Sequence, residues 1–412
     1  MLPKIAILYH DRSFFPLDLF QQVRGSAEIL WVLSSGVPID AQMERLLRRT
    51  GSVVDLRGLE EDKAAVALAV FEPDGIVSFV DDHLVTAAIL AAQLGLRYHT
   101  PDVAGVLMDK RYQRDALARA GIPGPSYWTL PEGATSEQVE ELALAITYPA
   151  VLKPAQGSGS RGILGISNPE ELRALGLAGG GGCGYIIEEY LYAEAPLERW
   201  YASYFSVETI VSDGRPNSVA ITGRFPLAEP FRETGNFIPG ILAPELQGPV
   251  LEMVSGAVEA LSIRDAVVHT EIKLTAEGPK LIEVNGRLGG RPPFVLRDVS
   301  DVNLFEAACQ VAVGRPFSWE GLAACEGVGY WLMVQPPTTA RRLSKLSGLD
   351  ACARLAGVSS VGPHVRPGDQ VDWREGTDGT VITIRGKVSD HRDLAETVDL
   401  IAGLVNVEYE GI

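Results

Sequence analysis

Polar side chains recur at every second position in two neighbouring segments, residues 269–273 and 283–287. They are His269, Glu271, Lys273, Glu283, Asn285 and Arg287. The turn between the segments contains Gly278 and Pro279, which predicts an antiparallel hairpin. Since successive side chains of a strand point to opposite faces, the hairpin would gather these polar groups on one face and apolar residues on the other.

Carboxylate and amide oxygens at this spacing form a hard ligand set. Magnesium prefers such a set and usually completes its shell with water and substrate phosphate. An exposed hairpin with a polar outer face is the other interpretation. The hairpin alone favours neither, so the decision depends on the rest of the chain.

A glycine-rich loop, residues 154–162, follows a predicted strand that ends at Lys153. Gly157–Gly162 spells G-x-G-x-x-G, but the segment after it is a predicted strand rather than a helix, which argues against a dinucleotide fingerprint. Backbone amides of such a loop can wrap phosphates, and Lys153 makes an ordinary hairpin loop the weaker interpretation. The expected phosphate contacts are Lys153, Gln156, Gly157, Ser158, Gly159 and Ser160.

Two weaker signals flank this loop. Lys110 opens the predicted helix 109–121, which ends at Gly-Ile-Pro; taken alone, it is an ordinary surface lysine. Glu188, Glu189, Tyr190 and Leu191 end another predicted strand. This strand either simply leaves its sheet, or its main chain forms a hinge that faces the edge of an adenine.

The first ~100 residues alternate short apolar runs with helical periodicity, which predicts an open α/β layer. The predicted strands are 5–9, 29–32, 53–56 and 75–80, and the helices 41–49, 62–71 and 84–94. The last ~90 residues predict a small α+β segment, with strands 329–334, 370–373 and 381–386 and a helix at 390–405.

The composition excludes several classes of protein. A formal net charge of −17 over 412 residues, without a long Lys/Arg run, argues against nucleic-acid and anionic-membrane partners. The four scattered cysteines favour neither a zinc site nor disulfides. No run of ~18 apolar residues occurs, so we expect a soluble, cytoplasmic protein with no membrane partner.

The order of these signals resembles the ATP-grasp superfamily of carboxylate–amine ligases. The resemblance is densest over residues 81–313 and extends to the flanking parts. It implies an α/β ATP-grasp fold in three parts. A Rossmann-like, biotin-carboxylase-like domain would span residues 1–105, and the ATP-grasp domain residues 106–320, with a lid at about 125–190. A small C-terminal α+β domain would span residues 321–412.

Within this superfamily the chain is most similar to the L-amino-acid and peptide ligases. The similar segments are Phe231–Gly235, His269–Glu271 and Arg287–Gly290. The resemblance implies that Lys110 and Lys153 bind ATP phosphates and that residues 188–191 bind adenine. It implies two Mg²⁺ ions, replaceable by Mn²⁺, on Glu271, Glu283 and Asn285. Arg287 and Lys153 would be catalytic, and the substrate residues would be Glu233, His269, Gly289, Gly290 and Arg291.

Three positions depart from the family's pattern. Tyr204 stands where relatives carry a ribose-binding Glu, a role that we assign instead to Glu194 or Glu198. Arg291 replaces a common Asp after Gly-Gly, and Asn236 replaces a His. These changes near the acyl site favour a specialised ligase of secondary-metabolite (antibiotic) peptide biosynthesis over a general dipeptide maker.

The implied reaction activates a carboxylate as an acyl phosphate, which the amine of an amino acid or peptide then attacks. Three alternatives stay open. Another ATP-grasp enzyme, biotin-carboxylase-like or of the purine pathway, would share the ATP residues. A protein kinase lacks support, because no His-Arg-Asp or Asp-Phe-Gly follows the loop. A regulatory ATP-binding module would not need Arg287. Many relatives pair as dimers, so the resemblance also allows a homodimer.

Overall fold

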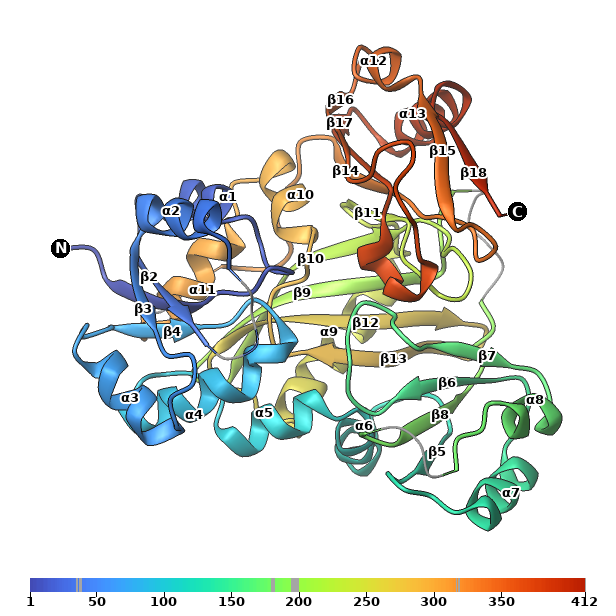
Figure 1. Ribbon diagram of the computed structural model, residues 1–412, viewed down its shortest axis with the longest axis horizontal. Coiled ribbons are helices and arrows are strands. Elements are labelled where there is room, and N and C mark those ends of the chain that lie inside the picture. The colour runs from blue at the N-terminus through green and yellow to red at the C-terminus, as the bar shows by residue number, and fades with distance from the viewer. Residues whose placement is uncertain are drawn as a thin grey trace.

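The computed structural model describes residues 1–34, 36, 39–178, 182–193, 200–315, 317 and 319–411. Figure 1 shows three lobes around a long central sheet: the N-terminal residues in blue, a green lobe below the sheet and the C-terminal residues in red above it. Within the described residues, no helix is long and apolar enough to cross a membrane.

The N-terminal lobe is a parallel sheet in the order β3-β2-β1-β4. Its strands are β1 (Lys4–Leu8), β2 (Glu28–Leu33), β3 (Ser52–Asp55) and β4 (Gly75–Val77). Its helices are α1 (Pro16–Val23), α2 (Ala41–Thr50), α3 (Glu61–Ala69) and α4 (Leu84–Leu94). Helices α1 and α2 pack on one face of the sheet, while α3 and α4 pack on the other. The strands are almost entirely apolar because both faces are covered.

The predicted lid, at about residues 125–190, contains a separate four-stranded sheet in the order β5-β8-β6-β7. Its strands are β5 (Tyr127–Leu130), β6 (Ala150–Pro154), β7 (Leu164–Ile166) and β8 (Tyr185–Glu189), covered by α7 (Ser136–Ala145) and α8 (Pro169–Ala174). Two helices, α5 (Pro101–Met108) and α6 (Lys110–Arg119), precede it. Strands β6 and β7 are antiparallel neighbours, which confirms the prediction that a strand follows the glycine-rich loop.

The central sheet has eight strands in the order β13-β12-β9-β10-β11-β14-β17-β16. Their bounds are β9 (Tyr204–Ser212), β10 (Arg215–Arg224), β11 (Gly235–Ile238), β12 (Ala266–Thr275), β13 (Gly278–Asn285), β14 (Val328–Val334), β16 (Val358–Pro363) and β17 (Ile382–Val388). The predicted hairpin is confirmed as β12 and β13, with His269 opposite Asn285 and Glu271 opposite Glu283. Helices α9 (Pro244–Ala260), α10 (Pro292–Val299) and α11 (Leu304–Ala312) connect its strands.

The C-terminal residues add β15 (Arg342–Ser347), β18 (Asn406–Glu410), α12 (Leu349–Cys352), α13 (His391–Leu404) and the 3₁₀ segment η2 (Trp373–Gly379). The predicted strand 370–373 is wrong: Gln370 forms only an isolated bridge, and Asp372 caps η2 by accepting from the Arg374 amide. Because β14 pairs with β11, the last part of the chain extends the central sheet. The domain boundaries at residues 105 and 320 stay predictions.

Candidate active site

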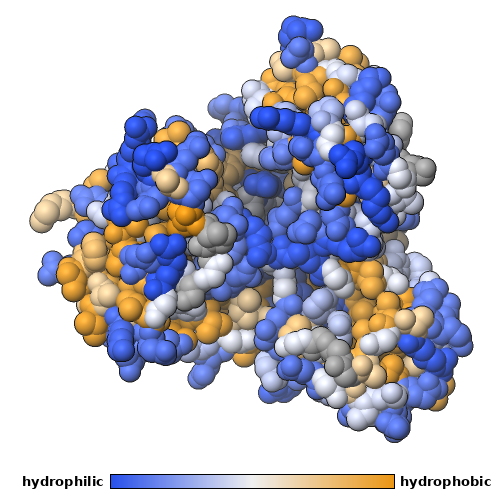
Figure 2. Space-filling model, viewed as in Figure 1, coloured by the Kyte–Doolittle hydropathy of each residue, from blue (hydrophilic) through white to orange (hydrophobic). Residues whose placement is uncertain are grey.

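A cleft of about 1190 Å³ lies where the three lobes meet. Hydrophilic residues gather in this hollow (Figure 2). Most of the predicted site residues line it: Lys110, Lys153, Gly157, Ser158, Gly159, Ser160, Glu188, Glu189, Tyr190, Leu191, Glu233, His269, Glu271, Glu283, Asn285, Arg287, Gly290 and Arg291. The exposed Gln156 is not among the lining residues. Gly289 lies behind the cleft wall, where a Cβ would come within 2.8 Å of His269 Nδ1.

Buried Glu188 ties the lid to the central sheet. Arg114 of α6 donates to its Oε1 at 2.8 and 3.0 Å, and Lys153 donates to its Oε2 at 2.5 Å. The same Arg114 side chain also donates to the main-chain carbonyl of Leu281 at 2.8 Å. Burial disfavours the carboxylate, but the two cations outweigh it and lower the pKa of Glu188 to about 2. The Glu188 side chain is therefore committed to ion pairs, and its backbone is paired with both β5 and β6. The adenine hinge at residues 188–191 stays a prediction.

Lys110 joins the loop to the hairpin. At the start of α6, its Nζ lies 3.0 Å from Glu283 Oε1 and donates to the Gly157 carbonyl at 2.8 Å. Burial disfavours the charge, yet Glu283 more than compensates and raises the pKa of Lys110. The lysine is charged at neutral pH, within reach of both the glycine-rich loop and the predicted metal ligands.

Buried charged residues of the neighbouring strands contact the polar face of the hairpin. The fully buried Glu208 of β9 lies with both oxygens 2.9 Å from His269 Nδ1 and accepts from Ser206 and Thr222. Burial disfavours a charged imidazole, but Glu208 outweighs it and raises the pKa of His269 to about 9. On the other side of the ring, His269 Nε2 lies 3.6 Å from Glu271.

Glu271 is held ionised among these groups. Burial acts against its charge, but His269 and Arg224 outweigh burial and lower the pKa of Glu271 to about 2. The Tyr204 hydroxyl also hydrogen-bonds with it. Tyr204 stands at the position where relatives are expected to carry a ribose-binding acid. Here it instead contacts Glu271 of the hairpin. Glu194 and Glu198, the predicted substitutes for that acid, lie outside the described residues.

Arg287 is fixed by an acid from the N-terminal lobe. Its Nε and Nη2 donate to the two oxygens of Asp81 at 3.0 and 2.6 Å, and its Nη1 donates to the Leu288 carbonyl. Asp81 begins the 3₁₀ turn η1 (Asp81–His83) that follows β4. Burial disfavours the cation, but Asp81 raises the pKa of Arg287. A bidentate pair of this kind sets the plane of the guanidinium as well as its position.

The glycine-rich loop contacts the C-terminal part of the chain. Gly159 has φ +66° and its carbonyl accepts from the Thr377 amide at 2.8 Å, while Arg161 pairs with Asp378 at 2.7 Å. Gly376 of η2 allows this approach, because a Cβ there would lie 2.0 Å from the Gly159 oxygen. The loop therefore packs against η2. The two paired residues, Arg161 and Asp378, are 217 residues apart in the chain.

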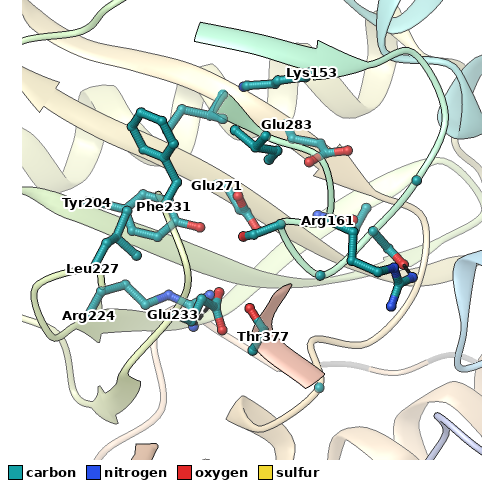
Figure 3. Close-up of a pocket in the computed structure, with 18 of the residues that line it drawn as sticks. Lys153, Arg161, Tyr204, Arg224, Leu227, Phe231, Glu233, Glu271, Glu283 and Thr377 are labelled. Carbon is teal, nitrogen blue, oxygen red and sulfur yellow. Dashed lines mark hydrogen bonds and ion pairs between the residues drawn. The ribbon is translucent and has the colours of Figure 1, made fainter. Parts of the chain in front are cut away.

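Arg224 and Glu233 mark the end of the cleft opposite Lys153, with Glu271 and Glu283 between them (Figure 3). Arg224 Nη1 lies 3.3 Å from Glu233, and its Nη2 lies 3.0 Å from His269 Nε2. The guanidinium of Arg291 stacks over the Trp331 ring at 5.2 Å. Asn236 is buried in β11 between Arg224 of β10 and Trp331 of β14, and neither of its amide atoms has a partner within the described chain.

The hairpin residues fit a magnesium site. Glu271 and Glu283 face each other across β12 and β13, and Asn285 lies one step further along β13. The described residues contain no group of three or more His, Cys, Asp or Glu side chains that could hold a metal ion alone. Two carboxylates and an amide suit magnesium, which commonly takes one or two protein carboxylates and leaves positions for water and phosphate.

Comparison with known proteins supports the resemblance seen in the sequence. Residues 107–291 match the ATP-grasp domain. This chain contains an ATP-grasp domain. It is 28% identical over 268 residues to carnosine synthase 1 of Mus musculus, covering 58% of this chain and 31% of that protein. It is 28% identical over 238 residues to alanine–anticapsin ligase of Bacillus subtilis, covering 54% and 50%.

The fold of the whole chain has a solved counterpart. The structure of an L-amino acid ligase from Bacillus licheniformis superposes with a TM-score of 0.79 at 19% identity, covering 99% of each chain. The predicted α/β ATP-grasp fold and the resemblance to its ligases are confirmed. The chain spans about a third to a half of the length of the two curated relatives.

Sequence reasoning missed four residues of the site: Asp81, Arg114, Glu208 and Arg224. For Glu208 a signal existed, since a charged residue stands inside the largely apolar strand β9; Arg224 ends β10, which also begins with an arginine, so no such signal marks it. Charged residues are rarely buried in a strand unless they are paired. Asp81 and Arg114 lie on surface-like segments, and nothing local to them indicates their partners.

Proposed function

We propose that this protein is an ATP-dependent carboxylate–amine ligase. It joins an amino acid or related small carboxylate to the amine of a second amino acid or peptide and releases ADP and phosphate. The observation that carries the proposal is the convergence on one cleft of the glycine-rich loop with its two lysines, the oxygen set of the hairpin, and Arg287. An ATP-binding regulatory module would have no use for the last of these.

The first step makes the carboxylate electrophilic. One of its oxygens attacks the γ-phosphorus of ATP, the bond to the β-phosphate oxygen breaks, and ADP leaves, giving an acyl phosphate. Phosphoryl transfer of this kind needs positioning and charge neutralisation more than covalent help from the protein. Lys110 and Lys153 supply positive charge, and the amides of residues 157–160 would bind the phosphates.

Magnesium held by Glu271, Glu283 and Asn285 would neutralise phosphate charge when bound. The residues of the chain prepare this set, since Glu271 is ionised at neutral pH and Glu283 is positioned by Lys110.

In the second step the amine nitrogen attacks the acyl carbon, the carbon–oxygen bond to phosphate breaks, and the nitrogen loses a proton. Negative charge develops on the acyl oxygen before phosphate leaves. Arg287 is suited to stabilise that oxygen, because Asp81 holds its guanidinium in one orientation before the substrate arrives. Preorganised donors of this kind cost no reorganisation during the reaction.

Two further features support the proposal. The relatives named for carnosine synthesis and for joining alanine to anticapsin fit amide formation between small molecules, including in secondary metabolism. All four cysteines are free thiols, which suits the cytoplasmic location predicted from the sequence. The cytoplasmic location and the homodimer stay predictions.

The proposal is tested with purified protein, ATP, magnesium and a matrix of carboxylates and amines, with phosphate release and product mass as readouts. A product equal to donor plus acceptor minus water, formed only with ATP, is expected. Bicarbonate-dependent turnover with a carboxylated product would instead assign the chain to the carboxylating ATP-grasp enzymes. Nucleotide binding without phosphate release from any pair would favour a regulatory module.

A further inference from the structure

Arg291 lines the cleft and has no ion-pair partner among the described residues. It follows Gly290 and occupies the N-cap position of α10. Its guanidinium lies over the Trp331 ring at 5.2 Å, and it makes neither a hydrogen bond nor an ion pair with any residue that the structure describes. Arg291 is half-buried. Withdrawing a guanidinium from water without an ion pair is costly, and a ligand in the cleft can supply the missing counter-ion.

Three other cations of the cleft show what pairing would look like, whereas Lys273, which also lines it, has no ion pair among the described residues and its pKa is lowered by burial. Arg287 pairs with Asp81, Arg224 with Glu233, and Lys110 with Glu283. In each of these three, the acid overcomes burial and raises the pKa of the cation. For Arg291, burial lowers the pKa, and the attraction of Asp378 and Glu233 does not compensate for it.

Arg291 lines the cleft, and its guanidinium is therefore open to a ligand there. Trp331 and Asn236, which lie opposite each other in the register, do not line the cleft, although Trp331 Nε1 and both amide atoms of Asn236 are buried without partners in the described chain. Glu233 lines the same cleft but pairs with Arg224 at 3.3 Å.

Arg291 is also within reach of the reacting centre. It lies four residues after Arg287, so their Cα atoms are at most about 14 Å apart. Arg287 is the group that we assign to the carboxylate undergoing activation. One amino acid, or a donor and an acceptor in contact, can therefore span both arginines.

We propose that Arg291 binds a second carboxylate, distinct from the one that is activated. This inference rests on the proposed function and adds the substrate class: the ligated pair carries an acidic group beside the reacting one. Two sources share this chemistry, the acidic side chain of the donor and the free α-carboxylate of the acceptor.

The test compares matched acidic and neutral ligands on the full-length protein loaded with ADP and magnesium. Binding of aspartate against asparagine and glutamate against glutamine, by calorimetry, tests the donor source. Glycine against glycinamide tests the acceptor source. The wild type is expected to prefer the acid in one of the two arms by about 10- to 100-fold, the range of a hydrogen bond to a charged group. The arm that shows the preference identifies the source.

Variants assign the preference to the side chain. R291M should abolish it, and R291K should keep only part of it, because a lysine cannot form the bidentate contact. R385M is the matched control: Arg385 also lies over the Trp331 ring, at 5.6 Å, but pairs with Asp298 and does not line the cleft. Its loss changes the packing of the ring, and the acid preference should survive.

A wild type without any acid preference in either arm would overturn the inference, and so would R291M with the preference intact. Melting temperature and ADP affinity of each variant show whether it is folded. The proposed function fails separately, if no pair gives an amide product although the acid preference in binding stands.

Discussion

The two ends of the cleft differ in how their charges are satisfied. At the nucleotide end, Lys153 and Arg114 share Glu188, and Lys110 pairs with Glu283. At the opposite end, Arg224 pairs with Glu233, but Arg291 has no ion pair within the described chain. The nucleotide end is thus held by ion pairs of the chain itself, whereas the substrate end keeps one cation without an acid. Changes at the first should cost stability, and changes at the second should cost mainly binding.

The largest effect is expected from E188Q. Removing the charge of Glu188 leaves Arg114 and Lys153 buried without their acid, which should lower the free energy of unfolding by about 3–5 kcal/mol. The folded-state pKa of Glu188 is about 2, below its usual value, so its contribution is present above pH ~4.3 and disappears as the pH falls toward 2.

Urea unfolding of wild type and E188Q across this pH range measures both predictions, since the gap between the two proteins should close in acid. E189Q is the matched control. The neighbouring Glu189 pairs with Lys280 but is partly exposed, so its loss should cost no more than about 1 kcal/mol. Equal losses for the two variants would contradict the view that Glu188 holds this end together.

Arg287 tests the centre of the cleft. R287A should leave ATP affinity nearly unchanged and lower the rate of amide formation by about 10²- to 10³-fold, the usual cost of one oxyanion donor. D81N keeps the arginine but loosens its orientation, so a smaller loss of about 10-fold is expected. Nucleotide binding and product formation are measured side by side. Near-normal turnover of R287A would remove the role that we give to this side chain.

The next largest effect is expected from disrupting the contact between the glycine-rich loop and η2. G376A places a methyl group against the Gly159 carbonyl and should prevent the loop from settling on η2. Since an acyl phosphate exposed to water hydrolyses, the ratio of amide formed to ATP consumed should fall by about 10-fold. R161M removes only a partly exposed ion pair, worth at most about 1 kcal/mol, and should lower this ratio less than 5-fold. An unchanged ratio in G376A would show that this contact does not seal the site.

The smallest expected effect is a gain in stability rather than a loss. N236L replaces two unpartnered buried polar atoms behind the substrate end by an apolar group and should raise the free energy of unfolding by about 1 kcal/mol. Thermal melting measures this change. A destabilised N236L would mean that Asn236 has a structural role, and the contrast between the two ends would then be weaker than we infer.

Local patterns predicted the parts of the site that are local in the chain. The alternation in β12 and β13 and the glycines between β6 and β7 both have short periods, and both were confirmed. The contacts that complete the site join distant residues: Arg287 and Asp81 are 206 residues apart, and Arg114 and Glu188 are 74 apart. A pattern that repeats over a few residues cannot predict contacts between residues so far apart in the chain.

The same reason explains the C-terminal part of the fold. Residues 370–373 alternate like a strand, but the Asp372 side chain bonds to the backbone two residues on and turns the chain into η2. That β14 joins β11 could not be predicted from either strand, because three helices separate β11 and β14 in the chain.

The pairing of β14 with β11 also bears on how such enzymes can be engineered. A chimera joined near residue 320 would exchange three strands of a continuous eight-stranded sheet, together with the surface on which the phosphate loop rests. The natural unit of exchange is much smaller. Residues 288–291 lie between β13 and α10 outside the ladder, so their replacement would alter the substrate end and leave the hydrogen bonding of the sheet intact.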